Sequence, residues 1–204
     1  MIVSLISLKG GVGKTTSAFF LAAVALERVK KGPVVLVDAD DEHSAAAWWD
    51  HVSPKPSRLS VVTADRNGFA RQVRELSSGA TGQPATVVID CPPNNREMLN
   101  RAASVSDHVL VPVRATGIDL DRLRSTLELL SDVDAQRNGL DVAVLFTHWR
   151  PRRKISREAL EALTGFPVLN SKIRQLAMYE EAHGTLPAGP ALEEYRAVWK
   201  EVTK

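Results

Sequence analysis

The chain has 204 residues, of which 44% are hydrophobic and 25% are charged, and its formal net charge is +2 at pH 7. This length and apolar content suit one well-filled domain over residues 1–204 and leave no obvious room for a second. The near balance of charges excludes binding to nucleic acid or membranes through global basicity, so any such surface must come from local clustering.

Short β-branched runs alternate with longer helical patterns along the chain. The runs are mostly apolar throughout, which is typical of a parallel sheet covered on both faces. The predicted strands cover 2–7, 33–38, 59–64, 85–90, 107–113 and 140–147. The predicted helices cover 15–31, 43–51, 68–78, 95–104, 118–136, 156–164, 174–182 and 190–203. A turn-rich connector is expected at 77–84. This alternation predicts an α/β fold with a doubly wound, mostly parallel sheet and helices on both faces.

Targeting signals and membrane spans are not expected. The single cysteine, Cys91, cannot form an intramolecular disulfide, and no stretch approaches the length of a membrane span. The apolar start MIVSLI has no basic leader and runs directly into a glycine-rich loop, unlike a secretory signal. We therefore expect a cytoplasmic protein.

The stretch SLKGGVGKTT, residues 7–16, follows the first predicted strand and opens the first predicted helix. Its backbone N–H groups can converge on phosphate oxygens, the helix N-terminus adds its dipole, and Lys14 can reach the outer phosphates. Thr15 would offer its hydroxyl to Mg²⁺, and Thr16 is placed to touch an inner phosphate. Leu8 stands where the strict G-x-x-x-x-G-K-[ST] motif has glycine. The order of strand, loop, lysine and hydroxyl predicts a P-loop NTPase whose nucleotide contacts are Gly10, Gly11, Val12, Gly13, Lys14, Thr15 and Thr16.

Three aspartates stand at the ends of predicted strands. Asp38 ends the second strand, Asp40 follows two residues later, and Asp90 ends the fourth strand. Because the carboxyl ends of parallel strands meet at one crevice, these carboxylates are expected beside the phosphate loop. One such acid could equally be a helix cap, but three together point to metal binding and water positioning.

Four stretches together resemble the ParA/MinD family of deviant Walker-A ATPases, most closely the small ParA partition proteins without an N-terminal DNA-binding domain. They are KGGVGKTT, VVLVDAD, VVIDCPP and SDHVLVPVRATGIDLDRL. The resemblance covers nearly the whole chain and includes the region VLNSKIRQLAMYEEAHG near the C-terminus. It implies ATP or ADP and Mg²⁺ as ligands, slow and partner-stimulated ATP hydrolysis, and a homodimer when ATP is bound. It also implies a centromere-binding adaptor protein, nonspecific DNA and a nucleoid-associated location.

The resemblance assigns roles residue by residue. Lys9 matches the signature lysine that in the family reaches the phosphates bound by the partner subunit, so Lys14 acts in cis and Lys9 in trans. Asp40 matches the acid that orients the attacking water, which completes the expected catalytic set. Asp38 matches the acid that links metal and switch, and Asp90 the acid at the hydration shell of Mg²⁺. The metal ligands implied are thus Thr15, Asp38 and Asp90.

The segment after the second acid departs from the family pattern. The family usually has Pro-Gln there, whereas this chain has Asp41 and Glu42, which places three acids in succession from Asp40. Extra negative charge beside a triphosphate should weaken nucleotide binding unless Mg²⁺ or a basic partner compensates. Slow intrinsic hydrolysis is therefore expected, and a non-hydrolytic binding module stays open as an alternative.

A basic cluster lies between 148 and 174, where seven basic residues face only Glu158 and Glu161. Its members are Arg150, Arg152, Arg153, Lys154, Arg157, Lys172 and Arg174. A solvated surface explains such a cluster about as well as a dimer face that holds DNA through phosphate contacts, which the resemblance favours. The resemblance also places Thr147, just before the cluster, where the family binds adenine.

Three functions compete. A ParA-like ATPase that segregates plasmid or chromosomal DNA is preferred, and cargo-positioning relatives, for example of carboxysomes, use the same cycle. A MinD-like membrane ATPase needs a basic amphipathic C-terminal helix, but the charges around the last apolar stripe balance, so we expect that stripe to dock on the domain and expect no membrane binding. An iron–sulfur scaffold needs paired cysteines, and Cys91 stands alone. The stripe consists of Leu192, Tyr195, Val198, Trp199 and Val202.

Overall fold

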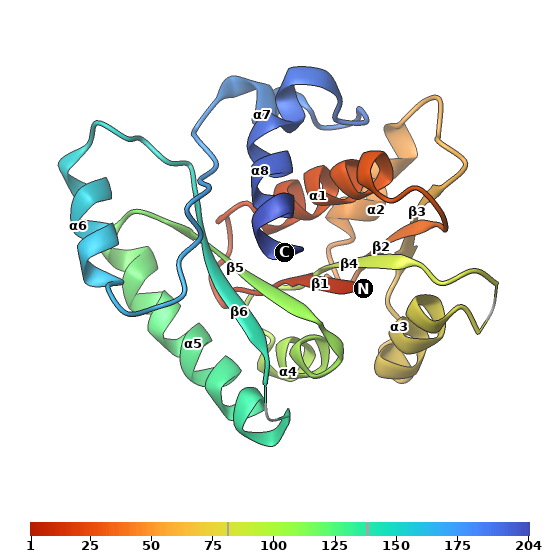
Figure 1. The fold of residues 1–204 in the computed structure, drawn as a ribbon, viewed down its shortest axis with the longest axis horizontal. Coiled ribbons are helices and arrows are strands. Elements are labelled where there is room, and N and C mark those ends of the chain that lie inside the picture. Colours follow the sequence, from red (N-terminus) through yellow and green to blue (C-terminus); the bar gives the residue numbers. More distant parts are fainter. Residues whose placement is uncertain (81, 138) are drawn as a thin grey trace.

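The computed structural model describes residues 1–80, 82–137 and 139–204, and a six-stranded sheet runs through its centre (Figure 1). The strand order is β3-β2-β4-β1-β5-β6, and every pairing is parallel. The strands are β1 (Ile2–Leu5), β2 (Val34–Asp38), β3 (Leu59–Thr63), β4 (Thr86–Asp90), β5 (His108–Arg114) and β6 (Asp141–Thr147). The predicted fold class is confirmed, and all strands end at the same edge of the sheet.

Helices cover both faces of this sheet. In Figure 1, α1, α2 and α8 lie on one side, and α3, α4 and α5 lie on the other. The helices are α1 (Lys14–Arg28), α2 (Ser44–His51), α3 (Phe69–Ser78), α4 (Arg96–Val105), α5 (Gly117–Arg137), α6 (Lys154–Ala162), α7 (Ala177–Glu181) and α8 (Glu193–Val202). A 3₁₀ turn, η1 (Gly189–Leu192), leads into α8. Each predicted strand and helix has its counterpart. The connector predicted at 77–84 includes residue 81, which lies outside the described residues.

The helix predicted at 174–182 is wrong at its start. Arg174 forms a parallel β-bridge with Trp149, and the Gln175 N–H donates to the Trp149 carbonyl oxygen at 3.2 Å. The backbone before Ala177 is therefore held extended beside the end of β6. Only the short α7 remains helical, because tertiary pairing overrides the local helical pattern.

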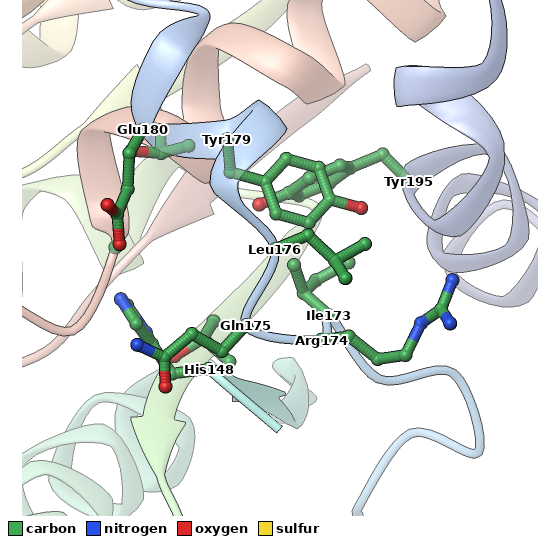
Figure 2. A pocket seen from close by; sticks show the side chains of 11 residues that line it. His148, Ile173, Arg174, Gln175, Leu176, Tyr179, Glu180 and Tyr195 are labelled. Atoms are coloured by element: carbon green, nitrogen blue, oxygen red, sulfur yellow. The ribbon is translucent and has the colours of Figure 1, made fainter. Parts of the chain in front are cut away.

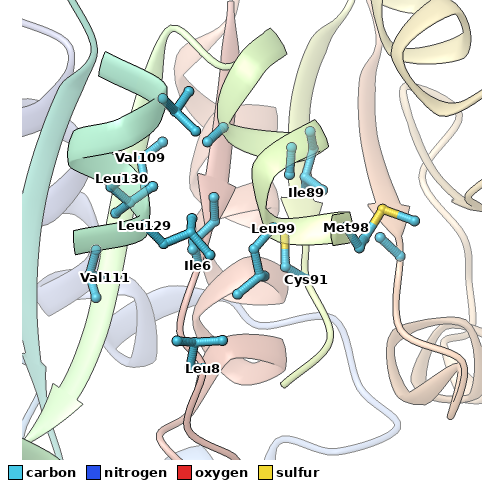
Figure 3. Packing of buried hydrophobic residues seen from close by; sticks show 14 of the residues in the cluster. Ile6, Leu8, Ile89, Cys91, Met98, Leu99, Val109, Val111, Leu129 and Leu130 are labelled. Atoms are coloured by element: carbon cyan, nitrogen blue, oxygen red, sulfur yellow. The ribbon is translucent and has the colours of Figure 1, made fainter. Parts of the chain in front are cut away.

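One apolar layer fills the space between the sheet and helices α4 and α5 (Figure 3). Ile6 packs there with Leu99 of α4 and with Leu129 and Leu130 of α5. Leu8 belongs to the same layer, and its N–H donates to the Thr126 hydroxyl of α5 at 3.2 Å. The residue that departs from the strict loop motif thus anchors the start of the loop in the core.

The opposite layer is aromatic and includes the C-terminal helix. The ring of Phe19 in α1 stacks on Trp48 of α2 with centroids 4.5 Å apart. All members of the predicted C-terminal stripe are buried, and α8 packs against α1. Burying each large apolar side chain stabilises the fold by roughly 1.5–3 kcal/mol. The prediction that this stripe docks on the domain is confirmed, and among the described residues no helix is both long and apolar enough to span a bilayer.

Candidate nucleotide-binding site

The glycine-rich loop between β1 and α1 has a backbone that L side chains rarely adopt. Gly11 and Gly13 have φ angles of 70° and 83°. A Cβ at Gly11 would meet nothing within 4 Å, so the backbone conformation, and not lack of space, favours glycine there. Helix α1 begins directly at Lys14, so its unpaired N-terminal N–H groups face this loop. The geometry is that of an anion-binding helix start.

The Lys14 ammonium is buried at the mouth of the loop. Its side chain lies largely out of solvent, and Nζ donates to the Lys9 carbonyl oxygen at 3.0 Å. Burial lowers the pKa of Lys14, while the carboxylates of Asp90 and Asp40 act in the opposite direction. A partly desolvated cation is thus held ready where a phosphate would lie, although its role there stays a prediction.

Asp90 is a buried carboxylate without a partner. It is 1% exposed, and neither of its oxygens has a hydrogen-bond partner in the described part of the chain. Burial raises its pKa to about 7, against the opposing effects of the Thr15 hydroxyl and the Lys14 ammonium. Because buried polar atoms are nearly always satisfied, this carboxylate needs a ligand.

Asp38, at the end of the neighbouring strand, already accepts hydrogen bonds from the backbone. Asp38 stands beside Asp90 in the register of β2 and β4. Its two oxygens accept the N–H groups of Asp40 at 3.1 Å and Ala46 at 2.9 Å, which ties the loop after β2 to the first turn of α2. Burial raises the pKa of Asp38, and these hydrogen bonds oppose the shift. Of the two acids, only Asp90 has both oxygens without a hydrogen-bond partner in the described part of the chain, and metal binding by Asp38 stays a prediction.

A magnesium ion fits this arrangement. Over residues 1–80, 82–137 and 139–204, no cluster of three His, Cys, Asp or Glu side chains is placed to hold a metal alone. Mg²⁺ commonly keeps several waters and binds through one or two carboxylates together with substrate phosphates. The free carboxylate of Asp90 and the hydroxyl of Thr15 provide such an incomplete shell.

Asp41 and Glu42, the two acids that depart from the family pattern, have different surroundings. The Asp41 carboxylate pairs with the Arg66 guanidinium, which belongs to the loop after β3. Glu42 instead lines the cleft over the glycine-rich loop together with Asp40 and Ser44. The chain itself therefore supplies a basic partner for one extra charge, and only Glu42 adds negative charge to the cleft.

A second cavity adjoins the loop on its other side (Figure 2). It shares Gly13 and Thr16 with the loop and is otherwise lined by residues from the end of β6 to α8. Thr147 lies at its floor, where its Oγ1 donates to the Val12 carbonyl oxygen at 2.8 Å. The full lining is Gly13, Thr16, Thr147, His148, Ile173, Arg174, Gln175, Leu176, Tyr179, Glu180 and Tyr195. The position of Thr147 suits a base-binding site, and its contact with adenine stays a prediction.

Sequence reasoning missed most of this second cavity. Tyr179 and Gln175 come from residues 168–184, a segment that belongs to the family resemblance but in which no residue was given a binding role. His148 is half-buried with a left-handed φ of 49°, and its Nδ1 has no partner within the described residues. Burial lowers the pKa of His148, and the nearby Arg114 adds to the shift. The neutral ring thus offers one more polar group beside Gly13.

Comparison with known proteins agrees with this geometry. The sequence pattern of the CobQ/CobB/MinD/ParA nucleotide binding domain matches residues 3–185. The chain belongs to this family. It is 29% identical over 183 residues to the maintenance of carboxysome distribution protein A of Halothiobacillus neapolitanus, covering 86% of this chain and 80% of the relative. It is 28% identical over 218 aligned positions to the chromosome-partitioning ATPase Soj of Treponema pallidum, covering 86% and 84%.

Solved structures of the same fold include a plasmid partition protein. The putative plasmid partition protein of Borrelia burgdorferi, bound to AMPPNP, superposes with a TM-score of 0.75 at 17% identity and covers 98% of this chain and 97% of its own. At this identity the likeness concerns the fold alone. The family membership rests on the sequence match, and the finer function of this ParA/MinD-family ATPase must be argued from its own residues.

In this family member, Lys9 stands at the edge of the loop. It is half-buried, and its side chain makes no ion pair within the described residues. The nearby buried Asp119 is already paired with Arg114, whose Nε lies 2.7 Å from a carboxylate oxygen. The Lys9 ammonium is therefore available for a partner.

The basic cluster is smaller than the sequence suggested. The expectation that only Glu158 and Glu161 oppose it is wrong, because Glu194 of α8 pairs with Arg174 across the fold. The Lys172 ammonium donates to the Asn170 carbonyl oxygen at 2.9 Å and lies over the Trp149 ring. The members that remain exposed and lack an acidic partner, as far as the structure describes the chain, are Arg150, Arg152, Arg153 and Arg157.

Proposed function

We propose that this protein hydrolyses ATP to ADP and phosphate and changes between monomer and dimer with its bound nucleotide. The observation that carries the proposal is the meeting of a buried lysine, Lys14, with a buried and unpartnered carboxylate, Asp90, beside a helix start. Isolated buried charges are costly, so such groups are retained where a charged ligand compensates them. A phosphate group with Mg²⁺ satisfies both at once.

Each residue of the site then has a distinct task. The backbone N–H groups of the glycine-rich loop hold the phosphates, and Lys14 neutralises the outermost ones. Thr15 and Asp90 hold Mg²⁺, which when bound polarises phosphate oxygens. The half-buried Asp40, at the rim of the cleft, orients the attacking water. Asp38 transmits changes in the cleft to α2 through its two backbone hydrogen bonds.

Lys9 is proposed to act on the nucleotide of a second subunit. Its free ammonium lies at the open edge of the loop, where a group contributed only by dimerisation would couple nucleotide state to assembly. Lys9→Ala should bind ATP with an affinity within about threefold of the parent, which is the usual effect of removing one surface charge. It should nevertheless fail to form a stable dimer. Light scattering with ATP and with ADP measures this, and Lys31→Ala, which removes an exposed lysine away from the loop, is the matched control. A Lys9→Ala protein that dimerises and hydrolyses ATP like the parent would refute the in-trans role.

We further propose that the ATP dimer binds nonspecific DNA and moves cargo with an adaptor protein. The similarity to Soj supports DNA segregation, and the similarity to the carboxysome distribution protein supports positioning of a protein compartment. The two candidates share one nucleotide cycle and differ in the adaptor. A small basic DNA-binding protein encoded next to this gene would favour partition, and a cluster of shell proteins would favour compartment positioning.

DNA binding is expected to depend on the exposed arginines after β6. Arg152→Ala with Arg153→Ala removes four phosphate contacts from a dimer, so the slope of log affinity against log salt should fall by up to about 3 to 4. Fluorescence anisotropy on unrelated duplexes, with ATP and with ADP, over a salt series measures the slope. The control is Arg71→Ala with Arg74→Ala on α3, which removes the same charge elsewhere. Equal DNA affinity in both double variants and the parent would show that the exposed arginines contact solvent and not DNA.

A further inference from the structure

One carboxylate outside the second cavity holds two of its walls. Glu194, in the first turn of α8, accepts the Arg174 N–H at 2.8 Å and the Tyr179 hydroxyl at 2.8 Å on the same oxygen. Its other oxygen pairs with the Arg174 guanidinium. Arg174 and Tyr179 both line the cavity and come from separate segments, the strip beside β6 and helix α7 (Figure 2).

The Tyr179 ring is fixed from its other sides as well. Its centroid lies 5.2 Å from that of Phe20 and 5.6 Å from that of Tyr195, both in edge-to-face geometry. The Tyr195 hydroxyl in turn lies 3.1 Å from the Ser17 hydroxyl, on the first turn of α1. Burial and the hydrogen bond to Glu194 raise the pKa of Tyr179, so its phenol stays protonated and keeps donating. The ring cannot swing away about its Cα–Cβ bond without breaking a charge-assisted hydrogen bond, which is roughly twice as strong as a neutral one.

We propose that Glu194 is a positioning residue for the nucleobase, which holds the Tyr179 ring and residues 174–176 in place before the nucleotide binds. The inference rests on the proposed nucleotide-binding function. A preformed wall spares the cost of ordering side chains on binding, about 0.5–1.5 kcal/mol for each.

Glu194→Gln and Tyr179→Phe test this link. Each should raise the dissociation constant of ADP about 2- to 10-fold, the ratio that corresponds to losing the order of one or two side chains. The dissociation constant of inorganic tripolyphosphate should stay within about twofold of the parent value, because this probe has no base and meets only the phosphate loop. The double variant should lose less affinity for ADP than the two single losses combined, since both changes act on the one hydrogen bond between Glu194 and Tyr179. Titration calorimetry measures all four proteins with both probes.

Glu201→Gln is the matched control. Glu201 lies on the same helix and accepts the N–H groups of Asn170 at 2.6 Å and Ser171 at 3.0 Å, so it anchors the same segment outside the cavity. The Glu201→Gln variant should have a lower melting temperature than the parent and the same affinity for ADP. The inference is overturned if Glu194→Gln binds ADP like the parent, if Glu201→Gln weakens ADP equally, or if tripolyphosphate binding falls in parallel. A parent protein that binds neither probe overturns the proposed function itself.

Discussion

Replacing Lys14 by alanine is expected to lower the affinity for Mg-ATP by about 100-fold or more, which corresponds to about 3 kcal/mol. The variant keeps the glycine-rich backbone and the start of α1, so some phosphate binding remains. It loses the buried Lys14 ammonium, which lies near the carboxylates of Asp90 and Asp40. The affinity for ADP should fall less than the affinity for ATP, because the ammonium binds the outer phosphates. Titration calorimetry with both nucleotides measures the difference.

The fold should survive this change. Lys14 is paired only with a backbone carbonyl, and burial already disfavours its charge, so its removal takes little from the stability of the nucleotide-free protein. Lys14→Arg is the informative companion, since it keeps the charge but not the compact ammonium that fits the loop. Equal Mg-ATP affinity in Lys14→Ala and the parent would show that the loop binds nucleotide without its lysine, against the proposed site.

The part of the site that is formed by consecutive residues could be predicted from the sequence. A strand, a glycine-rich loop and a helix follow one another between Ile2 and Arg28, so Lys14 and Thr15 needed no tertiary information. The parallel sheet then brings the strand ends together, and the register places Asp38 beside Asp90 as expected. Their different states could not be foreseen, because backbone N–H groups of the following loop occupy Asp38 and leave Asp90 free.

The remainder of the site depends on contacts between distant segments. Glu194 meets Arg174 twenty residues away in the sequence, and Arg66 in the loop after β3 meets Asp41 in the loop after the adjacent strand β2. Neither pair leaves a spacing pattern in the sequence, since each forms only after the helices pack on the sheet. The same packing turns the expected helix at residue 174 into the wall of a cavity. Local periodicity therefore predicted the elements well and the side-chain partners poorly.

Replacing Asp90 by asparagine is expected to stabilise the nucleotide-free protein while weakening its Mg²⁺-dependent nucleotide binding. Burial raises the pKa of Asp90 to about 7, so the folded state holds a proton that the unfolded state releases near pH 4. Folding of the parent thus becomes less favourable as the pH rises from about 4 to 7, and the cost is complete above pH 7, on the order of 2–4 kcal/mol. The uncharged amide avoids it. In thermal unfolding from pH 4 to pH 9, the melting temperature of Asp90→Asn should exceed that of the parent by an amount that grows with pH.

Asp38→Asn separates this effect from a general loss of acid. The Asp38 oxygens accept two backbone N–H groups, and an amide can accept only at its single oxygen, so Asp38→Asn should lose one of these bonds and be less stable than the parent at pH 4. Because burial also raises the pKa of Asp38, this loss should shrink as the pH rises. Asp90→Asn has no such bond to lose and should match the parent at pH 4, so the two neighbouring carboxylates are expected to differ there. If Asp90→Asn were destabilised at every pH, or kept the parent's Mg²⁺ dependence, then Asp90 would be an ordinary buried residue and not the strained, ligand-seeking group that its missing partners indicate.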